Sequence, residues 1–403
     1  MTPWLGIELF LCVAALVLLV PVTVLCAEIL LALAYDDKPA PTETGKRGRV
    51  AILVPAHDEA SIIASTLRSV IPQLAPNDRL LVVADNCSDQ TAAIATEEGA
   101  EVIVRSDPLR RGKGYALDCG VRHLEHDRHG PPDIVIVVDA DCQVGASAID
   151  RLARMCARTM HPIQAMYLMS AAENAGVKMR VAEFAWAIKN KVRPLGLYRL
   201  GLSCPLMGTG MAFPWRCIST ANLASGHLVE DLQLGVDLAL TGTAPLFCPQ
   251  ALVTSNFPSS EQGIETQRLR WEHGYLGVIF GQTLRLLMLS MRRVDGALLV
   301  FALDLSVPPI ALLVLLVTVL WSASAALYIF AHLALPIIIA TFAIVLLALG
   351  ISLAWRKYGR HIISLGDLAR TGLYVLWKIP LYAKFLGRRQ SEWVRSKRDK
   401  DLP

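Results

Sequence analysis

The chain has 403 residues, of which 54% are hydrophobic, and its mean hydropathy is +0.44. This is too apolar for an ordinary soluble protein, so part of the chain is expected in a membrane. The formal net charge of +4 is modest for this length, and no nucleic-acid partner is expected. The nine cysteines form no C-x-x-C pair and have no metal-ligand spacing, which indicates reduced thiols in a cytosolic domain.

The first apolar stretch runs from Leu9 to Ala27. It is long enough to cross the membrane, because the hydrocarbon core is about 30 Å thick and takes roughly 20 helical residues. No Lys or Arg precedes it, and no convincing small-residue cleavage site follows it. We therefore interpret residues 1–34 as a transmembrane anchor, with a removable signal peptide as the alternative.

Residues 48–274 are predicted to form an α/β domain with a mostly parallel sheet and flanking helices, because apolar β-branched runs alternate with helical patterns. In such sheets ligands bind beyond the carboxyl ends of the strands, and three aspartates fall there: Asp58, Asp85 and Asp139. The strands are predicted at 49–54, 79–84, 101–105 and 134–138, and the helices at 61–73, 88–98 and 114–124.

Asp139 and Asp141 follow the buried strand at 134–138 with one residue between them. Two carboxylates at this spacing can share one hard cation, and magnesium takes a couple of carboxylates together with diphosphate oxygens. Alone, the pair is a weak signal, since two acidic residues after a strand also occur by chance or cap a helix.

A second apolar block runs from Ala297 to Ala354, which is too long for one crossing and long enough for two. We expect spans at 308–330 and 333–354, and an interfacial helix at 274–291, so that residues 275–355 form the second membrane region. Two roles are open for Asp304, which either lines a polar path for product or caps the helix that starts near Pro308.

Basic residues mark one side of the predicted spans. They follow the first span, precede the second and follow the third, whereas the turn between the second and third has none. Because Lys and Arg are retained in the cytoplasm, we expect a multi-pass protein of the inner (cytoplasmic) membrane with residues 35–293 inside. Residues 356–403 are a basic tail whose aromatic and basic side chains predict an amphipathic helix among the lipid headgroups, with a solvated tail as the alternative.

Five short motifs follow one another along the domain. Residues 54–59 are similar to a P-x-x-N-E loop, with Asp58 in place of Asn. Residues 82–91 resemble a V-D-D-G-S-x-D-x-T segment, with Ala84 and Asn86 in place of the first Asp and the Gly. Residues 111–117 resemble G-K-x-x-A, and residues 229–231 resemble T-E-D. In this order the motifs resemble those of glycosyltransferase family 2, whose fold is GT-A.

The fifth motif, Gln267-Arg268-Leu269-Arg270-Trp271, fits Q-x-x-R-W fully. It resembles the branch of the cellulose, chitin-oligosaccharide and hyaluronan synthases, and a related form occurs in ceramide glucosyltransferases. The resemblance covers about residues 49–275 and implies an inverting transfer from a nucleotide sugar, with a UDP-sugar favoured.

The resemblance also implies site residues. Asp231 would take the proton of the attacking hydroxyl, and Arg270 would stabilise the leaving diphosphate together with Mg2+ or Mn2+ held by Asp139 and Asp141. The expected nucleotide-sugar contacts are Pro55, Glu59, Asp85, Lys113, Asp139, Gln267 and Arg270, and the expected acceptor contacts are Gly208, Thr209, Glu230 and Trp271.

Several alternatives stay open. Trp271 could be a packing residue or an interface anchor, and Glu230 could be a helix-start carboxylate favoured by the helix dipole. The expected acceptor is a lipid-linked glycan or a growing polysaccharide, with a simple sphingolipid-like lipid as the alternative. Three spans enclose little, so polymer secretion would need a homo-oligomer or an export partner. A catalytically silent synthase subunit is the competing class.

Overall fold

The computed structural model describes residues 3–36, 45, 47–127, 130–224, 229–258 and 261–370. The chain divides into two compact units. Of the described residues, those within 3–36, 173–200 and 279–370 belong to unit 1, and those within 45–172 and 201–278 belong to unit 2. The helix expected in the basic tail beyond residue 370 lies outside the described residues.

Unit 2 is built on an eight-stranded sheet in the order β3-β2-β1-β4-β7-β6-β8-β5. Four of its seven neighbouring pairs are parallel, which confirms the expected α/β fold with a mostly parallel sheet, and the other three make the sheet mixed. The strands are β1 (Val50–Ala56), β2 (Arg79–Asp85), β3 (Glu101–Arg105), β4 (Ile134–Val137), β5 (Gln143–Val144), β6 (Ile163–Ser170), β7 (Met211–Pro214) and β8 (Leu246–Asn256).

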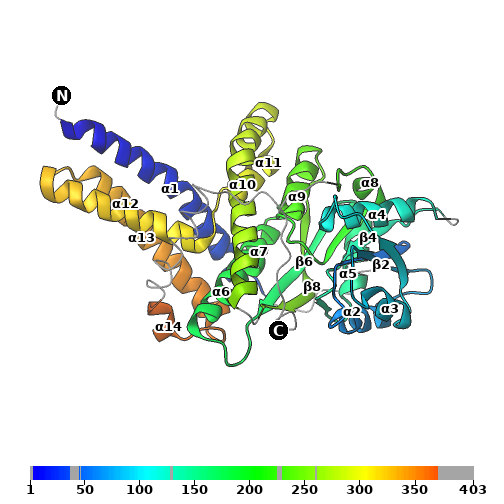
Figure 1. The fold of residues 1–403 in the computed structure, drawn as a ribbon. Helices are drawn as coiled ribbons and strands as arrows, with labels where there is room; N and C mark the ends of the chain where they lie inside the picture. The colour runs from blue at the N-terminus through cyan, green and yellow to red at the C-terminus, as the bar shows by residue number, and fades with distance from the viewer. Residues whose placement is uncertain are drawn as a thin grey trace. The chain divides into compact units, whose positions relative to one another are not determined.

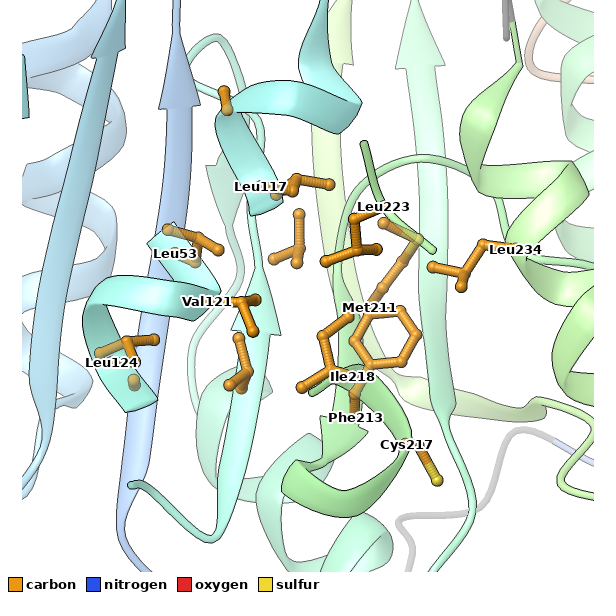
Figure 2. Close-up of a cluster of buried hydrophobic side chains, with 14 of the residues drawn as sticks. Leu53, Leu117, Val121, Leu124, Met211, Phe213, Cys217, Ile218, Leu223 and Leu234 are labelled. Carbon is orange, nitrogen blue, oxygen red and sulfur yellow. The ribbon is translucent and has the colours of Figure 1, made fainter. Parts of the chain in front are cut away.

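The central strands of this sheet are buried on both faces. Every residue of β4 is buried, and so are all those of β1 except Pro55. This double burial explains the continuous apolar runs in the sequence, because a strand covered on both sides has no polar face. On one face alternate strand residues, including Leu53 and Phe213, pack with Leu117 and Val121 of a helix (Figure 2).

The helices predicted between the first strands are present with shifted ends. They are α2 (Ile63–Val70), extended by the 3-10 turn η1 (Ile71–Gln73), α3 (Thr91–Glu97) and α4 (Lys113–Glu125). Later in unit 2 come α5 (Ala148–Thr159), α8 (Trp215–Ile218) and α9 (Glu230–Leu240). The long helix α10 (Glu261–Arg293) contributes its residues up to Val278 to unit 2 and the rest to unit 1.

Unit 1 is helical. In Figure 1 its helices α1, α12 and α13 lie side by side, and α1 also packs against α7 and α11. The elements are α1 (Pro3–Leu33), α6 (Val177–Ala187), the π-helical turn η2 (Ile188–Val192), α7 (Arg193–Arg199), α11 (Gly296–Leu305), α12 (Ile310–Ala331), α13 (Leu335–Ala354), a second π-helical turn η3 (Trp355–Gly359) and α14 (Leu365–Ala369).

Among the described residues, four helices are long and apolar enough to cross a membrane: Trp4–Leu33, Gln267–Arg293, Ile310–Ala331 and Leu335–Gly359. Three of them correspond to the predicted spans. The fourth is part of α10 and contains the segment expected as an interfacial helix. The helix after Asp304 begins at Ile310 with Pro309 as N-cap and no side-chain cap bond, so the capping role considered for Asp304 is wrong.

Candidate active site

The segment containing Asp139 and Asp141 is held by two buried threonines. The Asp139 N–H donates to Thr209 Oγ1 at 3.0 Å, and Thr66 Oγ1 donates to the Ala140 carbonyl at 2.7 Å. Both threonines are fully buried. Because these bonds fix the backbone on either side of the turn, the two carboxylates project from a rigid base at the carboxyl end of β4.

The same segment could hold a metal ion. Ligand atoms of Asp139, Asp141 and Cys142 all lie within 4.8 Å of one another. Burial, reinforced by Asp141 and Asp139, raises the pKa of the Cys142 thiol well above its usual range, so this sulfur stays protonated. The donors that remain are two carboxylates, which are the ligands that a hard divalent cation such as Mg2+ or Mn2+ prefers.

Lys113 joins this segment to the turn that contains Gly208. Its Nζ forms an ion pair with Asp139 Oδ1 and donates to the Gly208 carbonyl at 2.6 Å. Burial alone would lower the pKa of Lys113, but Asp139 and Glu230 outweigh it and the pKa is raised. The lysine therefore keeps its positive charge at neutral pH, where a diphosphate could use it.

Asp231 also lies close to Gly208. A Cβ added to Gly208 would lie 3.3 Å from Asp231 Oδ2 and 3.9 Å from Lys113 Nζ, so the carboxylate and the ammonium group both border the space beside this glycine. Gly208 has φ +99°, a conformation that side chains with a Cβ rarely adopt. Glycine at this position keeps the backbone open between the two functional groups.

Glu230 and Asp231 both belong to the first turn of α9, where the helix dipole favours negative charge. Burial and the adjacent Asp231 nevertheless raise the pKa of Glu230 to about 7, although Lys113 and Arg270 act in the opposite direction. Glu230 therefore titrates near neutral pH, and the charges of Lys113 and Arg270 both act on it.

Arg270 reaches this group from α10. Its charge acts on Glu230, and its Nε is buried with no hydrogen-bond partner among the described residues. Gln267 and Trp271 lie one helical turn from each other, so the Q-x-x-R-W side chains share one side of α10. The fold thus brings together Lys113, Asp139, Gly208, Glu230, Asp231 and Arg270.

The other predicted nucleotide contacts lie at the ends of β1 and β2. Pro55 is in register with Val83 of β2, and the Glu59 N–H donates to Thr91 Oγ1 at 2.7 Å. Asp85 ends β2 and is buried. Its Oδ1 accepts from Arg105 Nη1 at 2.5 Å, so any ribose or base contact would use a carboxylate that an arginine already holds.

Two residues of the site carry no signal in the motifs. Arg105 is the last residue of β3 and binds Asp85 from 20 positions away. Gln164 of β6 is fully buried; its Nε2 donates to the Thr209 carbonyl at 2.9 Å and its Oε1 accepts from the Met207 N–H at 2.8 Å. Gln164 therefore fixes the turn on which Gly208 lies.

This fold and this arrangement of charges define a GT-A glycosyltransferase. Residues 47–274 match the family described as "Glycosyltransferase like family 2". The match covers more than half of the chain, and the chain belongs to this family. The family match carries no assignment to the polysaccharide-synthase branch.

Individual relatives are more distant. The chain is 34% identical over 101 residues to the probable glycosyltransferase YdaM of Bacillus subtilis, a match that spans 23% of each protein. The mannosyltransferase PcManGT from Pyrobaculum calidifontis, solved in complex with GDP-Man and Mn2+, is 18% identical and similar in fold over 92% of this chain and 99% of its own, with a TM-score of 0.50. Glucosyl-3-phosphoglycerate synthase from Mycobacterium tuberculosis is 20% identical over 58% of this chain and 82% of its own, with a TM-score of 0.36.

Proposed function

We propose that this enzyme catalyses a metal-assisted, inverting transfer of a sugar from a nucleotide sugar to a membrane-associated acceptor. One observation carries the proposal. Lys113 bridges Asp139 and the Gly208 carbonyl, and Asp231 borders the same space beside Gly208. A group that can hold a diphosphate and a group that can accept a proton therefore lie close together.

The proposed reaction is a single displacement. Asp231 accepts the proton of the acceptor hydroxyl, whose oxygen forms a bond to the anomeric carbon as the bond from that carbon to the diphosphate oxygen breaks. The nucleoside diphosphate leaves with the electron pair, and the anomeric configuration inverts. Lys113 and Arg270 stabilise the charge that develops on the diphosphate, since both are cationic and positioned before the reaction.

Asp139 and Asp141 are the residues that would hold Mg2+ or Mn2+. A bound divalent cation would supply positive charge to the diphosphate oxygens. The Mn2+ in the PcManGT complex supports this assignment for a protein of similar fold.

For the donor we propose a UDP-sugar, on the resemblance to family 2. The GDP-Man held by PcManGT makes a GDP-sugar the alternative. For the acceptor we propose a lipid-linked glycan or an exopolysaccharide chain at the inner membrane, because the same chain carries several helices suited to a bilayer. A simple lipid acceptor is the second candidate.

The test uses the full chain in nanodiscs with Mg2+ or Mn2+, incubated with a panel of UDP- and GDP-sugars and membrane extract, with products identified by mass spectrometry. Asp231→Asn is expected to lower the transfer rate by about 10²- to 10⁴-fold, the usual contribution of a general base, and to leave nucleotide binding intact. Asp237→Asn, on an exposed position of the same helix, is the matched control. Equal rates in wild type and Asp231→Asn would refute the base assignment, and no turnover of any donor would favour a silent subunit.

A further inference from the structure

Three charged side chains are buried together in unit 1, and the proposed reaction uses none of them. They are Glu28 of α1, Arg193 of α7 and Asp304 of α11, with exposed fractions of 3%, 5% and 2%. Ionisable residues at membrane depth are costly, so they are generally paired and mark functional positions. We call these three residues the buried triad.

The arginine of the buried triad binds both acids. Arg193 Nε donates to Glu28 Oε2 at 2.8 Å, and Arg193 Nη2 donates to Asp304 Oδ1 at 2.6 Å and to the Asp304 carbonyl at 2.7 Å. One guanidinium therefore connects three helices. The backbones approach closely at the same place, because a Cβ added to Gly196 of α7 would lie 2.2 Å from the Glu28 carbonyl oxygen.

The charges of the buried triad do not balance, since two carboxylates face one guanidinium. Glu28 Oε1 and Asp304 Oδ2 are both buried and have no hydrogen-bond partner among the described residues. Yet the two carboxyl groups are neighbours, because both bind the guanidinium of Arg193. Asn190, one turn before Arg193, is also buried, and both of its amide atoms are without a partner in the described structure.

No second cation reaches the buried triad from the described elements that pack against α1. Helices α12 and α13 contain no charged residue. Arg199 of α7 and Lys189 of η2 are exposed, and Lys191 of η2 lies over the Tyr358 ring. Lys357 of η3 donates to the Leu33 and Tyr35 carbonyls at the end of α1.

A buried negative charge without a counter-charge is strongly unfavourable, and such a group takes up a proton instead. We propose that Glu28 and Asp304 share one bound proton, which makes the buried triad a neutral proton-binding site at the junction of α1, α7 and α11. If one of the two unpartnered oxygens, Glu28 Oε1 or Asp304 Oδ2, carries the proton, it can donate a hydrogen bond that the other oxygen accepts. One proton therefore gives both oxygens a partner and also removes the excess negative charge.

The direct test is infrared difference spectroscopy of the full chain in nanodiscs at neutral pH. Wild type is expected to show the C=O stretch of a protonated, buried carboxylic acid, which shifts in D2O. This band should lose one component in Glu28→Gln and in Asp304→Asn, because neither variant needs a proton to be neutral, whereas the contribution of Glu230 remains in all the proteins. Glu8→Gln, near the other end of α1, is the control and should keep the band. A band unchanged by either triad variant overturns the proposal.

Thermal stability gives an independent test. Each single variant keeps the triad neutral and should unfold near the wild-type midpoint, whereas the double variant Glu28→Gln/Asp304→Asn removes both carboxylates of the triad from the buried Arg193. We expect the unfolding midpoint of the double variant to fall by far more than the sum of the decreases in the two single variants. If instead Na+ or K+ raises the midpoint of wild type and has no effect on Glu28→Gln, then a metal cation holds the two oxygens and the proton assignment is wrong.

Discussion

Glu230 and Asp231 are adjacent on α9, and we expect them to have different roles in the active site. A general base must be ionised when the acceptor arrives, and Asp231 meets Lys113 across the open backbone at Gly208. Glu230 is pushed toward neutrality because burial and Asp231 both disfavour its charge, and its pKa rises to about 7.

The raised pKa of Glu230 predicts how stability depends on pH. Between the ordinary Glu value of 4.5 and about 7, the native state binds more protons at this position than the unfolded state, so stability falls as pH rises through that window. Glu230→Gln has no such proton. The free energy of unfolding of Glu230→Gln, relative to that of wild type, should therefore increase by on the order of 1–3 kcal/mol as the pH rises from about 4.5 to 7.

The measurement is thermal unfolding of both proteins in nanodiscs at a series of pH values. Glu97→Gln, an exposed glutamate on α3, serves as the comparison and should follow wild type. A constant difference between Glu230→Gln and wild type across the window would mean that Glu230 is ionised throughout it.

At the scale of elements, the active site depends on how β6 supports the turn at Met207–Gly210. Gln164 binds the turn at both Met207 and Thr209. Gly210, with φ +63°, lies so close to β6 that an added Cβ would be 2.7 Å from Ala165 Cβ. Strand and turn therefore act as one rigid support beneath Lys113 and Asp231.

Gln164→Met keeps the volume of this support and removes the two hydrogen bonds to the turn, together with the one that Gln164 Nε2 donates to the Ala165 carbonyl. We expect kcat to fall by about 10- to 100-fold with nucleotide affinity nearly unchanged, because the Gly208 carbonyl loses its fixed position against Lys113. A loss of about 1–3 kcal/mol in stability should accompany it, since a buried N–H and a buried C=O are left unpaired. Met166→Leu on the same strand is the control. If the variant weakens nucleotide binding as much as kcat, Gln164 contributes to binding and not to positioning.

The first four strands of the sheet could be predicted from the sequence to within two residues at either end. Three of them, β1, β2 and β4, are apolar runs that are almost wholly buried. The fourth, β3, lies at the edge of the sheet and is partly exposed, but its Val-Ile-Val run is typical of a strand. The strands β6, β7 and β8 were not predicted. Their partners lie far along the chain, and their antiparallel and bulged pairings leave no regular pattern in the residues themselves.

The site residues also divide into those that belong to a local sequence pattern and those that act through distant partners. Asp139, Lys113, Asp231 and Arg270 stand in short motifs whose order carries information, so they could be named from the sequence. Gln164 and Arg105 act only through partners 45 and 20 positions away. Nothing near them in the sequence distinguishes a buried Gln that supports a turn from a buried Gln that does not.

For the whole molecule, the open question is how many of the four candidate helices cross the membrane. Helix α10 meets the requirements of length and composition, yet it contains Arg285 and ends in Arg292 and Arg293. Arg285 is exposed, and an arginine near the middle of a span costs about 2.5–3.5 kcal/mol. We therefore expect α10 to lie at the interface and only α1, α12 and α13 to cross.

This count fixes which side each loop faces. With three crossings and the catalytic domain inside, the connection after α12, which has no Lys or Arg, faces outward; with four it would face the cytoplasm. In intact cells a membrane-impermeant maleimide should label His332→Cys and should label Glu97→Cys only after permeabilisation. Both changes are made in a background with Cys87 and Cys119 replaced by Ser, because the other seven cysteines are buried. Labelling of His332→Cys only after permeabilisation would mean that α10 crosses the membrane, and labelling of Glu97→Cys in intact cells would invert the orientation that the basic residues predict.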